Sequence, residues 1–366
     1  MRILHVTDVY RPRVGGIELF IEGLALRQIA AGHEVAVLSA TGPSGADDPA
    51  GLEVFRVPLA GYIWLRTLPT DLSSYDVVHT HLSVASIFTT RIGKAAAKAG
   101  VPVVNTVHSM WNGKEGWVRT IRALAGWRRL PQVWTSVSAN AAATVRAVLG
   151  PDADIHVVPN AVDVDYWRLP ARPSDDAVTF VTVMRLAGRK RPLQLVDMLA
   201  QARLDVPRSV ALRAIIVGEG PLEERTHARL AELGIDWVTL TGQLDAAQVR
   251  SVFAESDVFV APSLQESFGI AALEARSSGL PVVAMRSGGV GEFVRDGVEG
   301  LLCDDDDDMS RALARLASDD SLRARITSYD RTHAPVHDWS RTLEGFDEVY
   351  AAAESAAGSR RARVTA

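Results

Sequence analysis

Short apolar runs alternate with longer helical patterns twice along this chain, and this alternation limits the fold more than any other sequence feature. The first series begins at Ile3–Val6 and the second restarts at Val178–Val183. Most of the runs are short and wholly apolar, which is typical of parallel strands covered on both faces. Two successive β-α-β series predict an α/β protein with two Rossmann-like, doubly wound parallel sheets.

The 366 residues are enough for two domains, each with its own core. A stretch rich in proline and charge, 168–176, separates the two series and is interpreted as a linker. We therefore expect an N-terminal domain over 1–168 and a C-terminal domain over 177–335. Residues 336–356 form a last helical pattern, and the basic tail 357–366 is expected to be disordered.

Composition excludes several classes of protein. The formal net charge of −5 argues against a general nucleic-acid binder. The single cysteine, Cys303, excludes an intrachain disulfide framework and a cysteine metal site. The N-terminus enters a strand without a signal-like apolar region, and no run of about 18 apolar residues follows. We expect a cytoplasmic protein, with attachment to the inner membrane face left open.

The strongest candidate site lies between Pro262 and Ala275, after the strand Val258–Val260. Glu266 falls in the loop at the carboxyl edge of the sheet, and Glu274 falls two turns along the next helix. Between them, a helix N-terminus presents backbone N–H groups that favour an anion; these residues are Ser267, Phe268, Gly269 and Ile270. Acidic residues on both sides of an anion site suit a nucleoside diphosphate-sugar. The alternative is a capping glutamate and an ordinary surface glutamate.

Two further loops have the residues expected around phosphates. Arg185 and Lys190 follow the first strand of the second series, and both side chains can reach one diphosphate. Gly15 and Gly16 follow the first strand of the chain and open a helix, which is typical of a nest for an oxygen-rich ligand. Solvated surface charge and a plain strand-to-helix turn are the respective alternatives.

Together these residues resemble the retaining glycosyltransferases of family 4. Glu266 and Glu274 match that family's E-x7-E signature, and Arg185 and Lys190 match its R-L-x-x-x-K loop. The other matching segments are the di-glycine Gly15-Gly16, the G-x-G-P turn at Gly218, and the glycine-rich closing loop from Gly288 to Glu292. Met184 and Arg191 depart from the family, because glycine is usual at both positions.

The resemblance implies the GT-B fold, in which two domains face a central cleft. It implies that the protein is an enzyme, a hexosyltransferase that moves a hexose from a GDP- or UDP-linked donor to a glycan, lipid or small-molecule acceptor, for example a cell-envelope glycan. Glu274 would bind the donor ribose and Glu266 the transferred sugar. Arg185 and Lys190 would neutralise the leaving diphosphate, and Gly15, Gly16 and Gly218 would complete the donor site. The C-terminal helix would return to the N-terminal domain.

The same resemblance places a histidine after a T-x-H strand beside the reacting sugar, and His108 stands at that position. His79 and His81 follow a neighbouring strand, where ordinary hydrogen-bonded residues are the alternative. No side chain is an obvious nucleophile, so the family's front-face reaction is expected. Catalysis would then depend on fixed charges at the diphosphate, with no obligatory metal and no cofactor. The acidic run Asp304–Asp308 is interpreted as a helix start.

Residues 111–131 combine Trp111, Trp117 and Trp127 with several basic side chains. Such a basic amphipathic segment is compatible with an anionic membrane surface, and a helix packed on its own domain is the alternative. A sugar-nucleotide epimerase or hydrolase of the same fold is the rival function. A dinucleotide dehydrogenase is disfavoured, because Glu223 stands where its third glycine would be.

Overall fold

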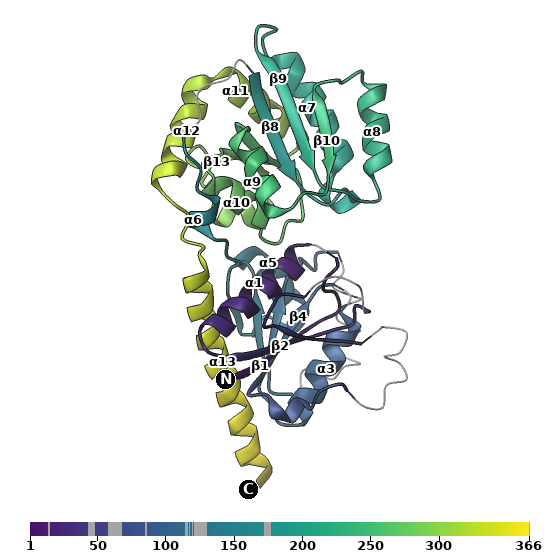
Figure 1. Cartoon of the computed structure of the whole chain (residues 1–366), viewed down its shortest axis with the longest axis vertical. Helices are drawn as coiled ribbons and strands as arrows, with labels where there is room; N and C mark the ends of the chain where they lie inside the picture. The colour runs from purple at the N-terminus through teal and green to yellow at the C-terminus, as the bar shows by residue number, and fades with distance from the viewer. Residues whose placement is uncertain are drawn as a thin grey trace. The chain divides into compact units, whose positions relative to one another are not determined.

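The computed structural model describes residues 1–13, 15–42, 48–57, 68–84, 86–113, 116, 118, 120, 130–171 and 177–365. It forms two compact units (Figure 1). The first unit contains Met1–Ala161 together with Trp339–Ala366, and the second contains Val162–Asp338. Each unit is built around one parallel sheet, as the sequence predicts.

The first unit has a seven-stranded sheet in the order β3-β2-β1-β4-β5-β6-β7. Its strands are β1 (Arg2–Thr7), β2 (Glu34–Ser39), β3 (Glu53–Arg56), β4 (Val77–Leu82), β5 (Val103–Val107), β6 (Val133–Ser136) and β7 (Ile155–Val157). The helices are α1 (Gly16–Ala30), η1 (Leu72–Ser74), α3 (Ile87–Lys98), α5 (Ala139–Leu149) and α13 (Trp339–Thr365). The strand order reverses between β1 and β4, where open α/β sheets bind their ligands.

Alternate strand residues of the first unit enter two separate cores. Ile3 and Val37 pack with α1 and α13 on one face, while Leu4 and Val78 pack with α3 on the other. Phe346 and Tyr350 of α13 are fully buried on the first face. The last helix therefore belongs to the core of the N-terminal unit, although the whole of the second unit intervenes in the sequence.

The second unit has a six-stranded parallel sheet in the order β10-β9-β8-β11-β12-β13. Its strands are β8 (Ala177–Val183), β9 (Ala211–Val217), β10 (Val238–Gly242), β11 (Val258–Ala261), β12 (Val282–Met285) and β13 (Gly300–Cys303). Its helices are α6 (Val164–Trp167), η3 (Gly188–Lys190), α7 (Pro192–Asp205), α8 (Glu223–Glu232), α9 (Ala246–Ala254), α10 (Ile270–Ser277), η4 (Gly289–Glu292), α11 (Asp306–Ser318) and α12 (Asp320–Thr332).

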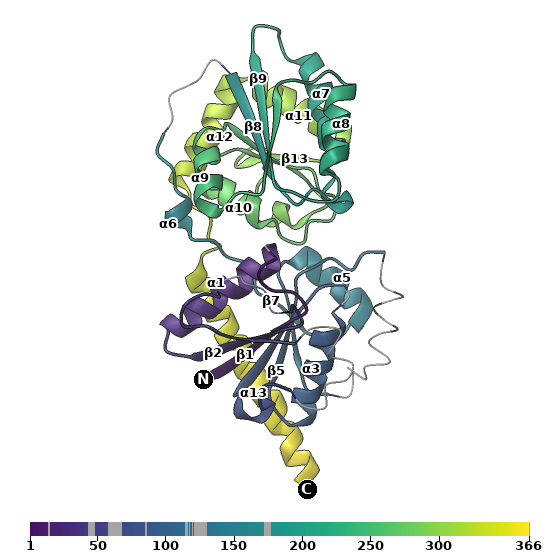
Figure 2. The same ribbon diagram turned by 45° about the vertical axis from the view of Figure 1, so that its right-hand side comes forward.

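The helices of the second unit cover both faces of its sheet (Figure 2). Helices α7, α8 and α11 contribute to one large core with the strands. On the other face, Phe253 of α9 packs against Phe259 of β11 with ring centroids 5.9 Å apart. The order reverses between β8 and β11, so the carboxyl ends of these two strands mark the expected binding edge.

The boundaries of the units differ from the prediction. The first unit ends at Ala161 rather than at residue 168, because Trp167 packs on Phe253 and its carbonyl accepts a hydrogen bond from Ser278. Val162 also pairs with Asp338 in an isolated bridge. Residues 172–176 of the predicted linker lie outside the described residues.

Two edge strands were not predicted, and the C-terminal tail differs from expectation. β7 and β13 are short edge strands of three and four residues, and β7 has too few residues to show a period in the sequence. Helix α13 continues to Thr365 through the segment expected to be disordered, because alanine and arginine favour a helix. None of the described helices carries an apolar stretch long enough to cross a bilayer.

Candidate functional site

The residues predicted to bind a donor in the second unit follow the two strands at its switch point. Arg185 and Lys190 come after β8, and Glu266 comes after β11. β8 and β11 are adjacent parallel strands, paired at Phe180 and Val258. Their carboxyl ends therefore meet at one edge of the sheet, although the two loops lie far apart in sequence.

Lys190 and Glu266 form the central contact of this edge. Nζ of Lys190 donates to Oε2 of Glu266 at 2.5 Å, and the two side chains are only 28% and 16% exposed. An ammonium group has three N–H donors. Lys190 can therefore keep Glu266 in place while it donates to a phosphate oxygen.

Helix α10 begins directly after Glu266 with an unusual backbone. Gly269 caps the helix with φ +97°, a left-handed conformation that side chains rarely adopt. Phe268 is buried against Phe293 with ring centroids 5.2 Å apart, which anchors the turn. Ser267, Gly269 and Ile270 are partly accessible at the start of the helix, where backbone N–H groups favour an anion.

Glu274 lies one turn into α10 and has a different environment from Glu266. Among the described residues it has no side-chain hydrogen bond or ion pair, and it is half-buried. Burial raises the pKa of its carboxyl to about 8. A strongly raised pKa at a sheet edge is typical of a functional carboxylate, and hydroxyl groups of a ligand would supply its missing donors.

Arg185 is exposed, and its guanidinium forms no ion pair within the described part of the chain. Its loop is held by the G-x-G-P turn: the N–H of Leu186 donates to the carbonyl of Glu219 at 2.8 Å. A Cβ atom at Gly218 would lie 2.0 Å from the carbonyl oxygen of Met184. Gly218 therefore allows the two loops to meet.

Arg191, where the family has glycine, has a physical explanation. Its φ is +62°, the only positive value at a non-glycine residue of the described chain. Its guanidinium donates two bonds to Asp306, at 2.6 and 2.8 Å, and one to the carbonyl of Pro262 at 3.1 Å. These bonds compensate the backbone cost and tie the Lys190 loop to the loop after β11. The sequence does not predict this pair, because nothing local links residues 191 and 306.

The glycine-rich closing loop, Gly288 to Glu292, is hydrogen-bonded to the backbone of Glu266. The N–H of Gly289 donates to the carbonyl of Glu266 at 2.7 Å. A Cβ at Gly289 would lie 2.4 Å from the carbonyl oxygen of Ser267. Only glycine allows this approach, so the loop holds the backbone of Glu266 in place.

In the first unit, Gly15 and Gly16 lie where α1 follows β1. Gly15 caps α1 in an extended conformation, and a Cβ there would lie 2.7 Å from Oε2 of Glu18. Glu18 is itself buried and pairs with Arg13 at 3.4 Å. The second glycine of the predicted nest is thus the first residue of the helix.

His108 directly follows β5, next to the switch point of the first unit. Its Nε2 lies 2.9 Å from Nδ1 of His81, and burial lowers the pKa of His108 to about 3. His79 and His81 are buried and hydrogen-bonded, as expected if they are ordinary structural residues of the sheet. His5 and Gln28, which no sequence motif marks, join the same network.

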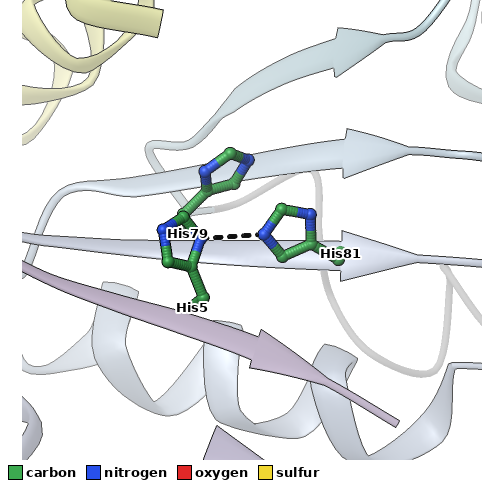
Figure 3. A group of neighbouring side chains, drawn as sticks. All are labelled: His5, His79 and His81. Carbon is green, nitrogen blue, oxygen red and sulfur yellow. Dashed lines mark hydrogen bonds between the residues drawn. The ribbon is translucent and has the colours of Figure 1, made fainter. Parts of the chain in front are cut away.

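His5, His79 and His81 are close enough to be considered as metal ligands, since one ligand atom from each lies within 4.8 Å of the others (Figure 3). All six of their ring nitrogens, however, have hydrogen-bond partners in the protein. A metal would have to break several of these bonds. The acidic run also has a structural explanation, because Asp305 caps α11 by accepting from the N–H of Asp308.

Most of the predicted membrane segment 111–131 lies outside the described residues, including Trp117 and Trp127. Trp111 is described and is 1% exposed in a core cluster with Val118. It is therefore not an interfacial aromatic residue, which corrects that part of the prediction. Burial in an apolar cluster is the more stable environment for its large ring.

Family models match both units. Residues 14–166 match the model "Glycosyltransferase Family 4", and residues 167–333 match "Glycosyl transferases group 1". The chain is 32% identical to a phosphatidylinositol N-acetylglucosaminyltransferase subunit from Arabidopsis thaliana, over 87% of this chain and 74% of that protein. It is 30% identical to a D-inositol 3-phosphate glycosyltransferase of Saccharomonospora viridis, over 96% and 93% of the two chains.

Solved structures show the same fold. The Anabaena protein HepE, in complex with UDP and glucose, aligns with a TM-score of 0.74 at 20% identity, covering 96% of this chain and 99% of that chain. A sucrose-phosphate synthase from Thermosynechococcus elongatus aligns with a TM-score of 0.75 at 19% identity, covering 95% and 98%. The two parallel-sheet domains thus have the GT-B fold. The chain belongs to the group 1, family 4 glycosyltransferases.

Proposed function

We propose that this glycosyltransferase moves a hexose from a UDP- or GDP-linked donor to an acceptor hydroxyl with retention of configuration. The observation that supports this most is the Lys190–Glu266 contact, which joins a cation for the diphosphate to an acceptor for sugar hydroxyls at one sheet edge. Glu274 would take the donor ribose, and Arg185 would share the diphosphate with Lys190. His108 of the first unit would contact the transferred sugar, as the family resemblance implies.

The proposed reaction follows a front-face course. The bond between the sugar and the diphosphate breaks as the acceptor oxygen bonds to the same carbon from the same side. The departing phosphate oxygen takes the proton of the acceptor hydroxyl. Arg185, Lys190 and the N-terminus of α10 stabilise the charge that develops on the diphosphate, so the proposal requires no divalent metal.

Glycan, lipid and small-molecule hydroxyls are the proposed acceptors. Two relatives are named for inositol-containing acceptors, so inositol phosphates and phosphatidylinositol are suitable first choices in an acceptor panel. The rival epimerase or hydrolase would consume the donor without any acceptor. Release of nucleoside diphosphate that depends on the acceptor, together with an α-linked product from an α-linked donor, would distinguish transfer with retention from that rival.

The nucleotide should be identified by thermal unfolding with UDP, GDP, ADP, dTDP and NAD in EDTA. One nucleoside diphosphate at 100 times its Kd should stabilise the protein by about 2.7 kcal/mol. Because burial raises the pKa of Glu274 to about 8, binding of ribose hydroxyls to the carboxylate requires loss of its proton. The affinity should therefore increase from about pH 6 to pH 8 and then level off.

Glu274→Gln is the matched variant, because it keeps the size of the side chain and removes its ionisation. The variant should bind the nucleotide more weakly. Its affinity should no longer increase toward pH 8, apart from the increase that ionisation of the diphosphate itself causes. A shift with NAD alone, or with no nucleotide until magnesium is added, would contradict the proposed site.

We also propose that the segment 111–131 makes peripheral contact with anionic membranes. The proposal is based on the basic residues Arg119, Arg122 and Arg128, which would attract anionic headgroups. In vesicle co-sedimentation, reversal of these three charges should abolish binding to anionic vesicles, while neutral vesicles bind neither form. Equal, weak binding of both forms to anionic vesicles would show that this idea is wrong.

A further inference from the structure

A chain of buried histidines crosses the sheet of the first unit beneath α1 and α13. His5 comes from β1, and His79 and His81 come from β4 (Figure 3). All three are at most 1% exposed. His5 pairs with His79 in the strand register, and His81 lies two residues further along the same face. This arrangement places the three imidazoles side by side in a core that is mostly apolar.

Two of these imidazoles, those of His5 and His81, belong to a hydrogen-bonded row that has one end at Gln28 and the other at His108. Oε1 of Gln28 lies 2.7 Å from Nε2 of His5, and Nδ1 of His5 lies 2.9 Å from Nε2 of His81. Nδ1 of His81 lies 2.9 Å from Nε2 of His108. A continuous series of three hydrogen bonds therefore connects α1 to the residue that follows β5.

All members of the row are neutral near pH 7. Burial lowers the pKa of His5 to about 4 and that of His108 to about 3, and it lowers the pKa of His81 well below its ordinary value. A neutral imidazole has one N–H donor and one acceptor nitrogen. The proton position on one ring therefore determines the proton position on the next.

The orientation of the Gln28 amide determines the donor-to-acceptor direction of the hydrogen bonds in the series. Its amide nitrogen donates to the hydroxyl of Tyr350 at 2.9 Å, so its Oε1 faces His5 and can only accept. His5 must then carry its proton on Nε2 and accept at Nδ1. By the same reasoning, His81 and His108 each carry their proton on Nε2. Nδ1 of His108 is then its acceptor nitrogen.

A second branch of the network has the same polarity. Because the Tyr350 hydroxyl accepts from Gln28, its own proton goes to Nδ1 of His79, 2.9 Å away. Nε2 of His79 then donates to the hydroxyl of Thr106 at 2.6 Å. Thr106 passes its proton to Thr135, also at 2.6 Å. The buried donors of Tyr350, His79 and Thr106 each meet an acceptor in this branch, which supports the assignment.

We propose that Gln28, His5 and His81 are positioning residues that hold His108 as its neutral Nε2–H tautomer. This inference deepens the proposed function and rests on the role proposed there for His108. A neutral His108 adds no positive charge to the reaction, so the charge of the departing diphosphate is left to Arg185 and Lys190. Helix α13 takes part through Tyr350, which orients the Gln28 amide.

The test is long-range ¹H–¹⁵N correlation NMR on the full-length protein labelled with ¹⁵N-histidine. Wild-type protein should show Nε2–H signatures for His5, His81 and His108. Gln28→Leu removes the acceptor at the start of the series, so His108 should lose its single tautomer. Gln28→Glu keeps an oxygen toward His5 and should restore it. Thr80→Val, a nearly isosteric change at a buried residue of β4 outside the row, should leave all three signatures unchanged.

Activity gives a second readout for the same variants. Gln28→Leu should lower kcat by roughly tenfold with little change in KM, a size of effect known for residues that orient functional histidines. Gln28→Glu should recover most of that loss. An Nδ1–H tautomer at His108 in the wild type, or an unchanged His108 signature in a folded Gln28→Leu variant, would overturn the proposal.

Failure of the proposed function would look different. The NMR readout needs neither donor nor acceptor, so the tautomers can be established without any transfer assay. If His108→Ala kept full transferase activity, the row would have no role in catalysis. The positioning role would then be overturned, even if the NMR spectra showed the expected tautomers. Loss of activity in His108→Ala together with the expected tautomers would support both.

Discussion

Replacement of Lys190 by methionine should lower kcat/KM by about 100- to 1000-fold, the range found when one preorganised donor to a developing charge is removed. The substitution removes the cation that we expect to stabilise the departing diphosphate. It also leaves Glu266 without its partner at 2.5 Å, in a position that is only 16% exposed. Steady-state kinetics with the donor identified by thermal unfolding would measure the effect.

Arg189→Met is the matched control for this prediction. Arg189 precedes Lys190 in the same turn, carries the same charge and is exposed. The change alters the net charge equally, so its kcat/KM should stay within about threefold of the wild type, since an exposed charge in water contributes little. Equal losses of kcat/KM in the two variants would mean that the positive electrostatic potential of the whole loop is what matters. Lys190 would then have no specific contact with the diphosphate.

The largest loss of stability is expected for Arg276→Met in α10. The guanidinium is 9% exposed and lies 3.2 Å from Glu299 and 3.3 Å from Asp330, both of which are buried. It also donates to the carbonyl of Phe293. Burial already raises the pKa of Asp330 to about 8, and the charge of Arg276 opposes that rise. Without it, Asp330 loses its cationic partner, and among the described residues Glu299 keeps only Arg295 as a cationic partner.

Removal of one partner from a buried ion pair usually costs about 3–5 kcal/mol. The midpoint of thermal unfolding of the second unit should therefore fall by about 10 °C. Arg286→Met provides the control: Arg286 also bonds two acids, Asp296 and Asp304, but is 46% exposed. It should change the midpoint only slightly, because exposed ion pairs contribute little. Similar decreases in both variants would contradict the importance of burial.

The sequence was sufficient to predict the main elements of both sheets. Val178–Val183 was expected as a strand and is the larger part of β8, and the helix expected after Gly16 is α1. These elements have strong periods, and burial on both faces leaves a clear apolar run. The short strand β7 and the end of the first unit at Ala161 were not predicted, because three residues show no period and packing of Trp167 decides the boundary.

The candidate site was predictable in its residue types but not in its contacts. Glu266, Glu274, Arg185 and Lys190 could be selected from their spacing within single loops and from the family resemblance. The left-handed backbone of Arg191 and its bonds to Asp306 could not, since these residues are 115 positions apart. A family glycine replaced by arginine was the only signal that this position is special.

The sequence by itself determined which chemical groups this protein has and on which strand or helix each lies, because local periodicity reflects burial and local spacing reflects turns. The tertiary structure decided which groups meet. The register of β8 and β11 brings Lys190 to Glu266 across 76 residues. The return of α13 to the first unit brings Tyr350 to Gln28 across 322 residues. Such contacts depend on how sheets and helices pack, and no local pattern in a single sequence encodes that packing.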